Sequence, residues 1–249
     1  MVIVSIACEQ SLYSRVMDEI FKNEAGINEL LEPFGLLVIG SLKVNQEDRI
    51  PDLSDGLQPR HLLLVGNGGS SFWPVFSRSP EFMDGLADPL DRWSRRVGDA
   101  LAAALGGRSI FPFEGPPHPP FLSWAARTGK VVSSRLSLFI HERLGLWHAY
   151  RFALAIPKFN EQAIDRSVFE SPCLKCKDMP CLDVCPVDAF AGQSYDADMC
   201  MDYLLSDATS ACRNRGCAAR RACPVGESFT YLQEHAKFHM DSYIKPHIL

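Results

Sequence analysis

Eight of the nine cysteines in this 249-residue chain lie between Cys173 and Cys223. They form two groups that each end in a Cys-Pro dipeptide: Cys173, Cys176, Cys181 and Cys185, then Cys200, Cys212, Cys217 and Cys223. Thiolates are good ligands for soft metals and for the iron of clusters, whereas disulfides are rare in the reducing cytoplasm. We therefore expect these eight cysteines to bind metal.

Eight thiols match the ligand requirement of two 4Fe–4S clusters, because each iron of such a cluster takes one thiolate. In bacterial two-cluster ferredoxins, the cysteine that precedes proline ligates the other cluster. Applied to this chain, that rule predicts two crossed ligand sets. One set is Cys173, Cys176, Cys181 and Cys223, and the other is Cys185, Cys200, Cys212 and Cys217.

The spacing departs from that of ordinary ferredoxins, since four residues separate Cys176 from Cys181 where two are usual. A longer loop costs little, so the departure affects the partition of the ligands more than their number. Two structural zinc sites are an alternative, but such sites usually contain two Cys-x2-Cys pairs each. Disulfides or separate core thiols are the remaining alternatives. Cys8 is interpreted as a small buried hydrophobic residue.

A second set of candidate residues precedes the cysteines. A glycine-rich turn after the apolar run 61–65 would suit a phosphate or nucleotide, and the segment 141–151 is rich in histidine, aromatic residues and arginine. The candidates for cofactor binding are Gly66, Asn67, Gly68, His141, Trp147, Tyr150 and Arg151. Structural roles are the alternative for all of them: a tight turn, core positions, and an ion pair with a core carboxylate.

The cysteine pattern resembles the two-cluster module of epoxyqueuosine reductases and reductive dehalogenases, in which a lone cysteine, here Cys200, precedes the second group. The segment 141–151 resembles a motif of CblC-type cobalamin-processing proteins, with a His, a Gly, a Trp and an Arg at similar spacing. The layout is most similar to bacterial ferredoxin-like proteins that share both blocks. The resemblance implies the crossed ligand sets and a cobalamin-binding domain derived from the nitroreductase fold.

The helices and strands expected from the sequence, which must position these residues, indicate an α+β protein of two domains. We expect an α/β cofactor- or substrate-binding domain over residues 1–165 and a dicluster ferredoxin-like domain over residues 166–249. Asp88 and Pro89 are expected to begin the clearest helix, which Gly106 ends. Hydrophobic periodicity predicts helices over 12–31, 72–76, 89–105 and 121–127, strands over 35–44, 61–65, 108–113, 136–140 and 148–156, and a rigid proline loop over 114–120.

Composition narrows the class of protein. Apolar residues make up 47% and charged residues 22% of the chain, as in ordinary globular proteins. The net charge of −5 offers no basic footprint for nucleic acid, so a tRNA substrate is not expected. No membrane span or targeting signal is recognised, and a cytoplasmic location is expected. A local basic run would offset cluster charge or dock an acidic redox partner: Arg213, Arg215, Arg220 and Arg221.

The resemblance implies an oxidoreductase. Two 4Fe–4S clusters would take electrons from a ferredoxin- or flavodoxin-like donor and pass them to a corrinoid, cobalamin or a relative of it, in the first domain. A small molecule would be the final acceptor. An electron carrier or cofactor-trafficking protein without its own substrate is the alternative, and so is a flavin in place of the corrinoid.

Overall fold

The computed structural model describes residues 23–159, 169–191 and 194–247. Cys8 and the first part of the helix expected over 12–31 lie outside the described residues, and the rest of that helix is present as α2 (Glu24–Leu31). Among the described residues, none of the helices combines the length and the apolar character needed to cross a bilayer.

The described residues form two compact units, and each unit is discontinuous in sequence. The first unit contains residues 23–67, 74–128 and 150–159, and the second contains 68–73, 129–149, 169–191 and 194–247. The boundary expected at residue 165 separates the cysteines from most of the first unit. However, two stretches from the first part of the chain, 68–73 and 129–149, pack with the cysteine-rich segment.

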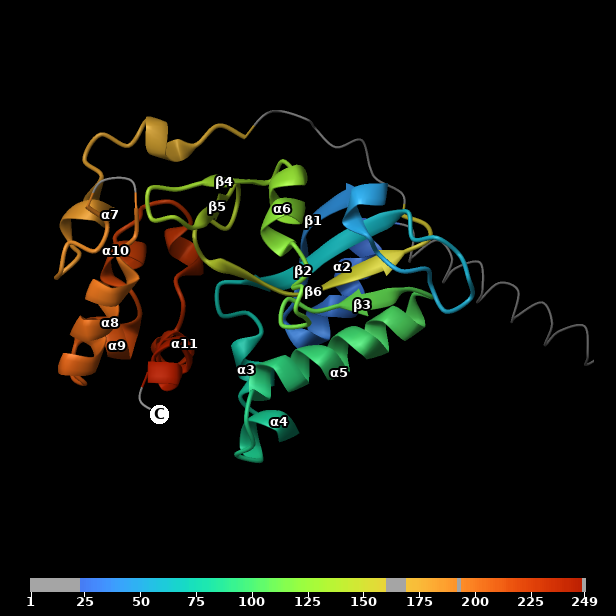
Figure 1. Ribbon diagram of the computed structural model, residues 1–249, viewed down its shortest axis with the longest axis horizontal. Coiled ribbons are helices and arrows are strands. Elements are labelled where there is room, and N and C mark those ends of the chain that lie inside the picture. The colour runs from blue at the N-terminus through green and yellow to red at the C-terminus, as the bar shows by residue number, and fades with distance from the viewer. Residues whose placement is uncertain (1–22, 160–168, 192–193, 248–249) are drawn as a thin grey trace, which may run out of the picture. The chain divides into compact units, whose positions relative to one another are not determined.

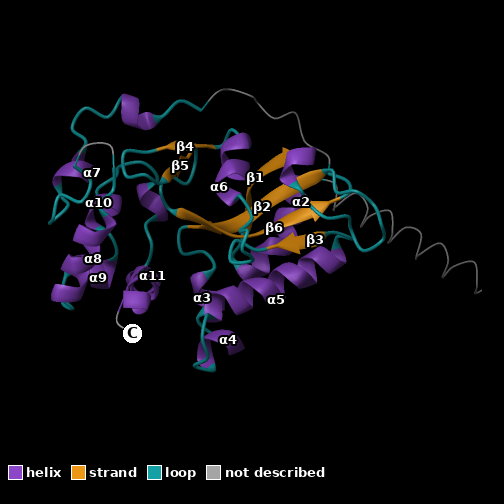
Figure 2. Cartoon of the chain, viewed as in Figure 1, coloured by secondary structure: helices purple, strands orange, loops and turns teal. Residues whose placement is uncertain are grey.

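A four-stranded antiparallel sheet is the centre of the first unit (Figures 1 and 2). Its order is β1 (Leu37–Lys43), β2 (His61–Gly68), β6 (His148–Ile156) and β3 (Arg108–Ile110). Strand β2 is buried almost throughout, which explains its near-continuous apolar sequence, and β6 is buried over residues 152–156. The strands expected over 35–44 and 148–156 are therefore confirmed, and β3 covers only part of the extended run expected over 108–113.

Helix α5 (Pro89–Ala104) packs on β3 through the apolar stripe that its sequence predicts. Trp93 and Val97 on this stripe are each 1% exposed. Pro89 occupies the first turn as expected, but the expectation that Asp88 caps the helix with its side chain is wrong. Asp88 has a left-handed backbone (φ 51°) and makes no capping hydrogen bond, so the fixed φ of Pro89 starts the helix instead.

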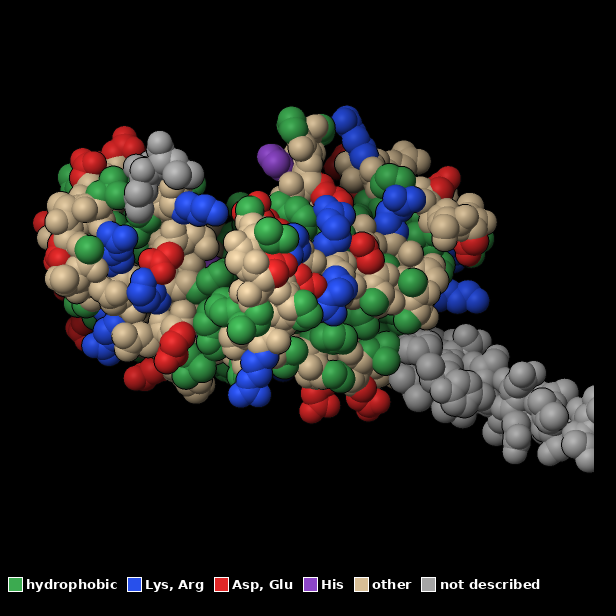
Figure 3. All heavy atoms as spheres, turned by 90° about the horizontal axis from the view of Figure 1, so that it is seen from below, with side chains coloured by type: hydrophobic (Ala, Val, Ile, Leu, Met, Phe, Trp, Pro, Cys, Tyr) green, Lys and Arg blue, Asp and Glu red, His purple; other side chains and the backbone are tan. Residues whose placement is uncertain are grey.

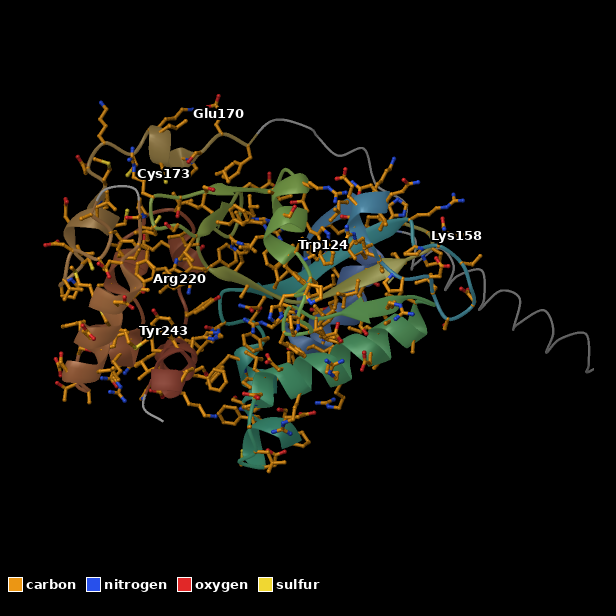
Figure 4. The ribbon with its side chains drawn as sticks, in the orientation of Figure 1. Trp124, Lys158, Glu170, Cys173, Arg220 and Tyr243 are labelled. Carbon is orange, nitrogen blue, oxygen red and sulfur yellow. The ribbon has the colours of Figure 1, made fainter. Side chains whose placement is uncertain are left out.

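Two further helices lie at their expected positions, and a third was not predicted. Helix α6 (Phe121–Arg127) has the bounds that the sequence predicts, α3 (Trp73–Phe76) carries Pro74 in its first turn, and α4 (Pro80–Met83) was not expected. The buried carboxylate of Asp48 holds α6 in place. It accepts a hydrogen bond at 2.9 Å from Nε1 of Trp124, whose side chain is labelled in Figure 4, and it pairs with the guanidinium of Arg127.

The second unit consists of a two-stranded antiparallel sheet and short helices. The sheet pairs β4 (Val131–Ser133) with β5 (Phe139–His141), so the strand expected over 136–140 begins later and its partner was missed. The helices of this unit from residue 169 on are α7 (Pro180–Asp183), α8 (Ala197–Ser206), α9 (Ala211–Arg215), α10 (Ala218–Arg221) and α11 (Gln233–Ile244). Single 3-10 turns of this unit are η3 (Pro172–Leu174), η4 (Glu227–Phe229) and η5 (Lys245–His247). The first unit contains the 3-10 turns η1 (Glu32–Phe34) and η2 (Gln46–Asp48).

Charged side chains are mixed on the surface rather than gathered by sign. On the face drawn in Figure 3, lysine and arginine side chains alternate with acidic ones and with apolar side chains. Four ion pairs on the first unit fit this pattern, among them Arg92–Asp84 and Arg96–Glu81. The surface shown therefore lacks the basic stripe that nucleic-acid-binding proteins display.

Candidate metal centres

Four thiols of the second unit act on one another electrostatically. Burial raises the pKa of the Cys181 thiol, and the neighbouring thiolates of Cys223, Cys173 and Cys176 raise it further. The pKa of Cys223 is raised by burial and by the charges of Cys173 and Cys176. Such mutual effects require sulfur atoms within a few ångströms to about a nanometre of one another. These four cysteines therefore form one group.

The other four thiols form a second group by the same criterion. Burial raises the pKa of Cys200, and the charges of Cys185 and Cys212 add to this rise. Burial also raises the pKa of Cys217, as do the charges of Cys212 and Cys200. The two groups have the same members as the two crossed sets expected from the sequence. Cys185, which precedes Pro186, thus groups with cysteines of the second half of the motif. Cys223, which precedes Pro224, groups with cysteines of the first half.

A single metal ion requires ligand side chains that converge on one point. Among the described residues, no three His, Cys, Asp or Glu side chains converge closely enough to hold one ion. A zinc ion requires thiolates at about 2.3 Å, whereas the thiolates of a 4Fe–4S cluster bind four different irons and so stand further apart. All eight cysteines are free of disulfides. The thiols are therefore available as metal ligands.

Backbone amides and one tyrosine surround these sulfur atoms. The amide of Ala189 donates to Cys185 Sγ at 3.3 Å. Hydrogen bonds from the amides of Arg220 and Ala219 lower the pKa of Cys217, against the rise due to burial. The hydroxyl of Tyr195 does the same for Cys200. Donors to sulfur stabilise the thiolate form, and in iron–sulfur proteins they tune the reduction potential.

Arg220 connects the second cysteine group to the loop before β6. Its Nε and its terminal nitrogen donate to the carbonyl oxygen of Leu146 at 3.1 and 2.6 Å. Its guanidinium lies 4.6 Å from the ring centre of Trp147 and 4.4 Å from that of Tyr231. The arginine is therefore held by a carbonyl and two aromatic rings, and it positions the 217–223 loop.

The rest of the arginine run is also used internally, apart from one member. Arg221 Nε donates to the carbonyl of Gly216 at 3.3 Å, and Arg213 donates to that of Leu204 at 3.4 Å. Arg215 is the member whose side chain is exposed. The run therefore braces the cysteine loops, and it offers an acidic partner less basic surface than its sequence suggests.

His141 is a structural residue of a tight turn. Its Nδ1 accepts the amides of Arg143 and Leu144 at 3.1 and 3.3 Å, so the neutral ring carries its proton on Nε2. The backbone of His141 also exchanges hydrogen bonds with Gly145, at 2.8 and 3.0 Å. The lone pair that a cobalt or iron ion would need at Nδ1 is thus engaged by the protein itself.

His148 has the electronic state that a metal ligand or proton acceptor requires, and sequence reasoning passed over it. Its Nδ1 donates to the carbonyl of Gly145 at 3.1 Å, which leaves the lone pair on Nε2. Burial lowers its pKa to about 4, and the nearby charges of His141 and Arg220 contribute to this shift. The ring is therefore neutral at physiological pH. Its place inside the 141–151 motif was the available signal.

The expected glycine-rich turn is displaced. Gly66, Asn67 and Gly68 lie in β2, and Gly66 pairs with Leu37 of β1, so their amides serve the sheet and cannot cradle a phosphate. The expectation of a turn at these residues is wrong because the strand continues. The turn begins at Gly69, where φ is +60° and a Cβ atom would lie 2.8 Å from the carbonyl oxygen of Phe229.

The remaining candidates divide between the two units. In the first unit, Arg151 Nε donates to Oδ1 of the fully buried Asn67 at 3.2 Å, and burial raises the pKa of Tyr150. In the second unit, Trp147 is 3% exposed. Its Nε1 is buried and has no hydrogen-bond partner among the described residues. Arg151 therefore pairs with a polar core residue, and Trp147 retains an unused donor.

The first unit also has an open pocket of about 410 Å³ that contains none of the expected site residues. Arg95 on its wall pairs with Glu114 at 3.0 Å and lies 4.5 Å from the ring centre of Phe111. Asp99 accepts the hydroxyl of Ser109 on the same wall. These polar groups satisfy one another, so the pocket presents no converging set of ligand-binding groups.

No protein-family model matches this chain, and no curated protein matches its sequence. The family resemblance stated from the cysteine pattern and the 141–151 motif therefore stays a prediction.

Proposed function

We propose that the second unit is an electron-transfer module that holds two 4Fe–4S clusters in a dicluster ferredoxin-like arrangement. The observation that carries this proposal is the sorting of the eight thiols into two mutually interacting groups of four. Each group combines three cysteines from one half of the motif with the cysteine that precedes proline in the other half. Zinc would favour tighter sites, and scattered core thiols would not sort into fours. The clusters, when bound, supply reversible one-electron transfer.

The residues of the chain would serve this function in three ways. The cysteines supply one thiolate for each iron, the amides of Ala189 and Arg220 donate to sulfur, and Arg220 fixes the loop that carries Cys217 and Cys223. Seven of the eight cysteines are only partly buried. Partial burial shields the sulfur atoms from bulk water while keeping the clusters near the surface, where a ferredoxin- or flavodoxin-like donor could reach them.

For the first unit we propose a cofactor-binding role of the cobalamin-processing type, on a nitroreductase-derived fold. Its support is an antiparallel sheet that helices cover, together with the end of the 141–151 segment, Tyr150 and Arg151, which belongs to this unit. Arg151, held by the buried Asn67 and itself only partly buried, would orient a polar edge of the cofactor. His141 does not fit as a cobalt ligand through Nδ1, because two amides already donate to that atom. The whole protein would then be a reductase of a small molecule.

The test is anaerobic purification, an iron count, and titration of the protein with hydroxocobalamin while its absorbance is recorded. Two clusters require about eight irons per chain. A saturable shift of the cobalt bands would support the reductase. About eight irons without a shift would favour the second candidate, an electron carrier or cofactor-trafficking protein, and a flavin titration would follow. A preparation with zinc and no iron would contradict the cluster proposal.

A further inference from the structure

A buried histidine on α11 has both ring nitrogens in hydrogen bonds. His235 is 0% exposed, its Nδ1 lies 2.8 Å from Ser70 Oγ, and its Nε2 lies 2.9 Å from Nε2 of His239. The ring stacks on Tyr231, with ring centres 3.9 Å apart, and on Trp73, at 5.3 Å. All these residues belong to the second unit. Neither the cysteine groups nor the 141–151 motif accounts for this arrangement.

The contact between the two Nε2 atoms fixes how many protons the pair can hold. A hydrogen bond of 2.9 Å requires one proton between the two nitrogens, because two N–H groups would repel each other. The neutral pair holds one proton on each ring. It can take one more, on an Nδ1 atom, without losing the bond. Two neutral rings in this geometry therefore form an acceptor for a single proton.

Ser70 can form a hydrogen bond with His235 in both the neutral and the protonated state of the histidine pair. Its Oγ accepts the amide of Leu232 at 2.8 Å, and its hydroxyl proton can point to His235 Nδ1 while that nitrogen is unprotonated. When Nδ1 carries a proton, the same oxygen becomes the acceptor. The partly buried His239 is the member through which a proton would reach the buried ring. Ser70, His235 and His239 thus form a hydrogen-bonded chain that can take up a proton and pass it along.

This chain lies next to the second cysteine group. Helix α11 packs against α9, which carries Cys212. A Cβ atom on Gly216, the neighbour of Cys217, would lie 3.2 Å from Cβ of Ala236. Tyr231 contacts both the ring of His235 and the guanidinium of Arg220. An electron added at this group would therefore be felt electrostatically at the histidine pair.

Other ionisable groups on α11 and its neighbours set the background charge. Lys237 and Asp241 pair with each other at 2.7 Å, and the hydroxyl of Tyr243 bonds that of Tyr195 at 3.1 Å. The remaining charged side chains of α11, α10, α9 and α8 are Glu234, Arg220, Arg221, Arg213, Arg215, Asp198 and Asp202. The arginines do not titrate in the physiological range, so the histidine pair is the group of this region suited to proton exchange near neutral pH.

We propose that Ser70, His235 and His239 make electron transfer in the second unit proton-coupled: the pair takes one proton from solvent when the cluster of Cys185, Cys200, Cys212 and Cys217 accepts one electron. The electron comes from the external donor, and the proton stays on the imidazole pair until the cluster is oxidised again. The inference rests on the proposed cluster function. It gives the electron carrier a means of delivering a hydrogen equivalent rather than a bare electron.

The experiment is a redox titration of the iron-loaded protein with mediators and dithionite between pH 5.5 and 8.5, followed by electron paramagnetic resonance. One proton per electron lowers the potential by about 59 mV for each tenfold fall in proton concentration. We expect one cluster to approach this slope in the native protein and to lose it in His235→Gln. Ser70→Ala should move the sloping region to lower pH, because the protonated ring loses its acceptor. His118→Gln, an exposed histidine of the first unit, is the matched control.

The outcomes separate this inference from the cluster proposal. Iron-loaded protein with potentials that do not depend on pH, or a slope that survives in His235→Gln, would overturn the proton coupling alone. Protein that binds no iron would overturn both. If His235→Gln loses its iron, the test rests on Ser70→Ala. A dependence of the reduction potential on pH that is the same in Ser70→Ala as in the native protein would then contradict the proposal.

Discussion

The two units differ in the interactions that stabilise the fold of each. The first has a sheet with fully buried apolar strands and a sixteen-residue helix with a wide apolar stripe. The second has two longer helices, α8 and α11, several helices of four or five residues, and small apolar clusters into which cysteines pack. Short helices are marginal without strong packing. On the proposed function, bound metal would do for the second unit what the apolar core does for the first.

The largest effect expected from this difference is that of metal removal. We expect chelation of iron under mildly oxidising conditions to unfold most of the second unit, since metal binding and folding are coupled in small metal-rich units. Limited proteolysis with mass spectrometry would then show cleavage after residue 169 and protection of 74–128. Uniform cleavage of both units, or of neither, would contradict the comparison.

Loss of a single ligand should remove about half of the iron. Cys181→Ser is expected to reduce the iron content from about eight to about four per chain, because one cluster loses a corner. Cys8→Ser is the matched control and should keep all of the iron. Iron counting and the visible absorbance of the anaerobic protein measure both. If Cys181→Ser kept the native count, the ligand sets would be wrong.

A cavity in the sheet should destabilise the first unit without affecting the metal. Leu64 is 0% exposed, and Leu64→Ala is expected to cost about 2–5 kcal/mol of unfolding free energy. The exposed Leu57, changed to alanine, should stay within about 0.5 kcal/mol of the native protein. Urea unfolding gives the free energies, and both variants should keep their iron. A loss of iron in Leu64→Ala would show that the units are not independent in stability.

The bracing role of Arg220 should be visible as a moderate loss of stability in the second unit. Arg220→Lys removes the two-pronged contact with Leu146 and weakens the contacts with two aromatic rings, at a cost of about 1–2 kcal/mol. Arg215→Lys, on an exposed side chain, should change little. The rate of iron release to a chelator is the measurement. Equal rates in both variants would argue against the bracing role.

The smallest expected effect concerns His148. Its folded pKa of about 4 lies below the ordinary value of 6.5, so the unfolded chain binds more protons between these values. Stability should therefore rise with pH through this window and fall on acidification. His148→Gln should flatten the dependence of urea unfolding between pH 5.5 and 7.5, where native clusters persist. An unchanged slope would mean that other groups dominate.

The sequence predicts some parts of this molecule well for identifiable reasons. The helix 121–127 and the strand 148–156 have the expected bounds because local periodicity and burial agree there. Local pattern misplaced the glycine turn, since nothing in the residues 66–68 reveals that β1 continues beside them. It also missed β4, whose three residues acquire their strand character only from pairing with β5.

The candidate sites divide in the same way. The crossed cysteine sets were expected from spacing and a ligand rule, and as ligand sets they stay a prediction. His148, Ser70 and His235 were missed because their roles depend on contacts between segments far apart in the chain. His141 was given a ligand role that its own turn prevents, since the amides of Arg143 and Leu144 lie in the residues that follow it.

The discontinuity of the second unit has a consequence for the order in which the protein matures. The sheet of the first unit is complete once residue 156 has left the ribosome, whereas 68–73 and 129–149 must wait for the cysteine-rich segment. Those stretches, with Trp73 and Trp147, expose apolar surface throughout that delay. Supply of iron at the end of synthesis would thus set the moment at which these early-made segments are protected from misassembly.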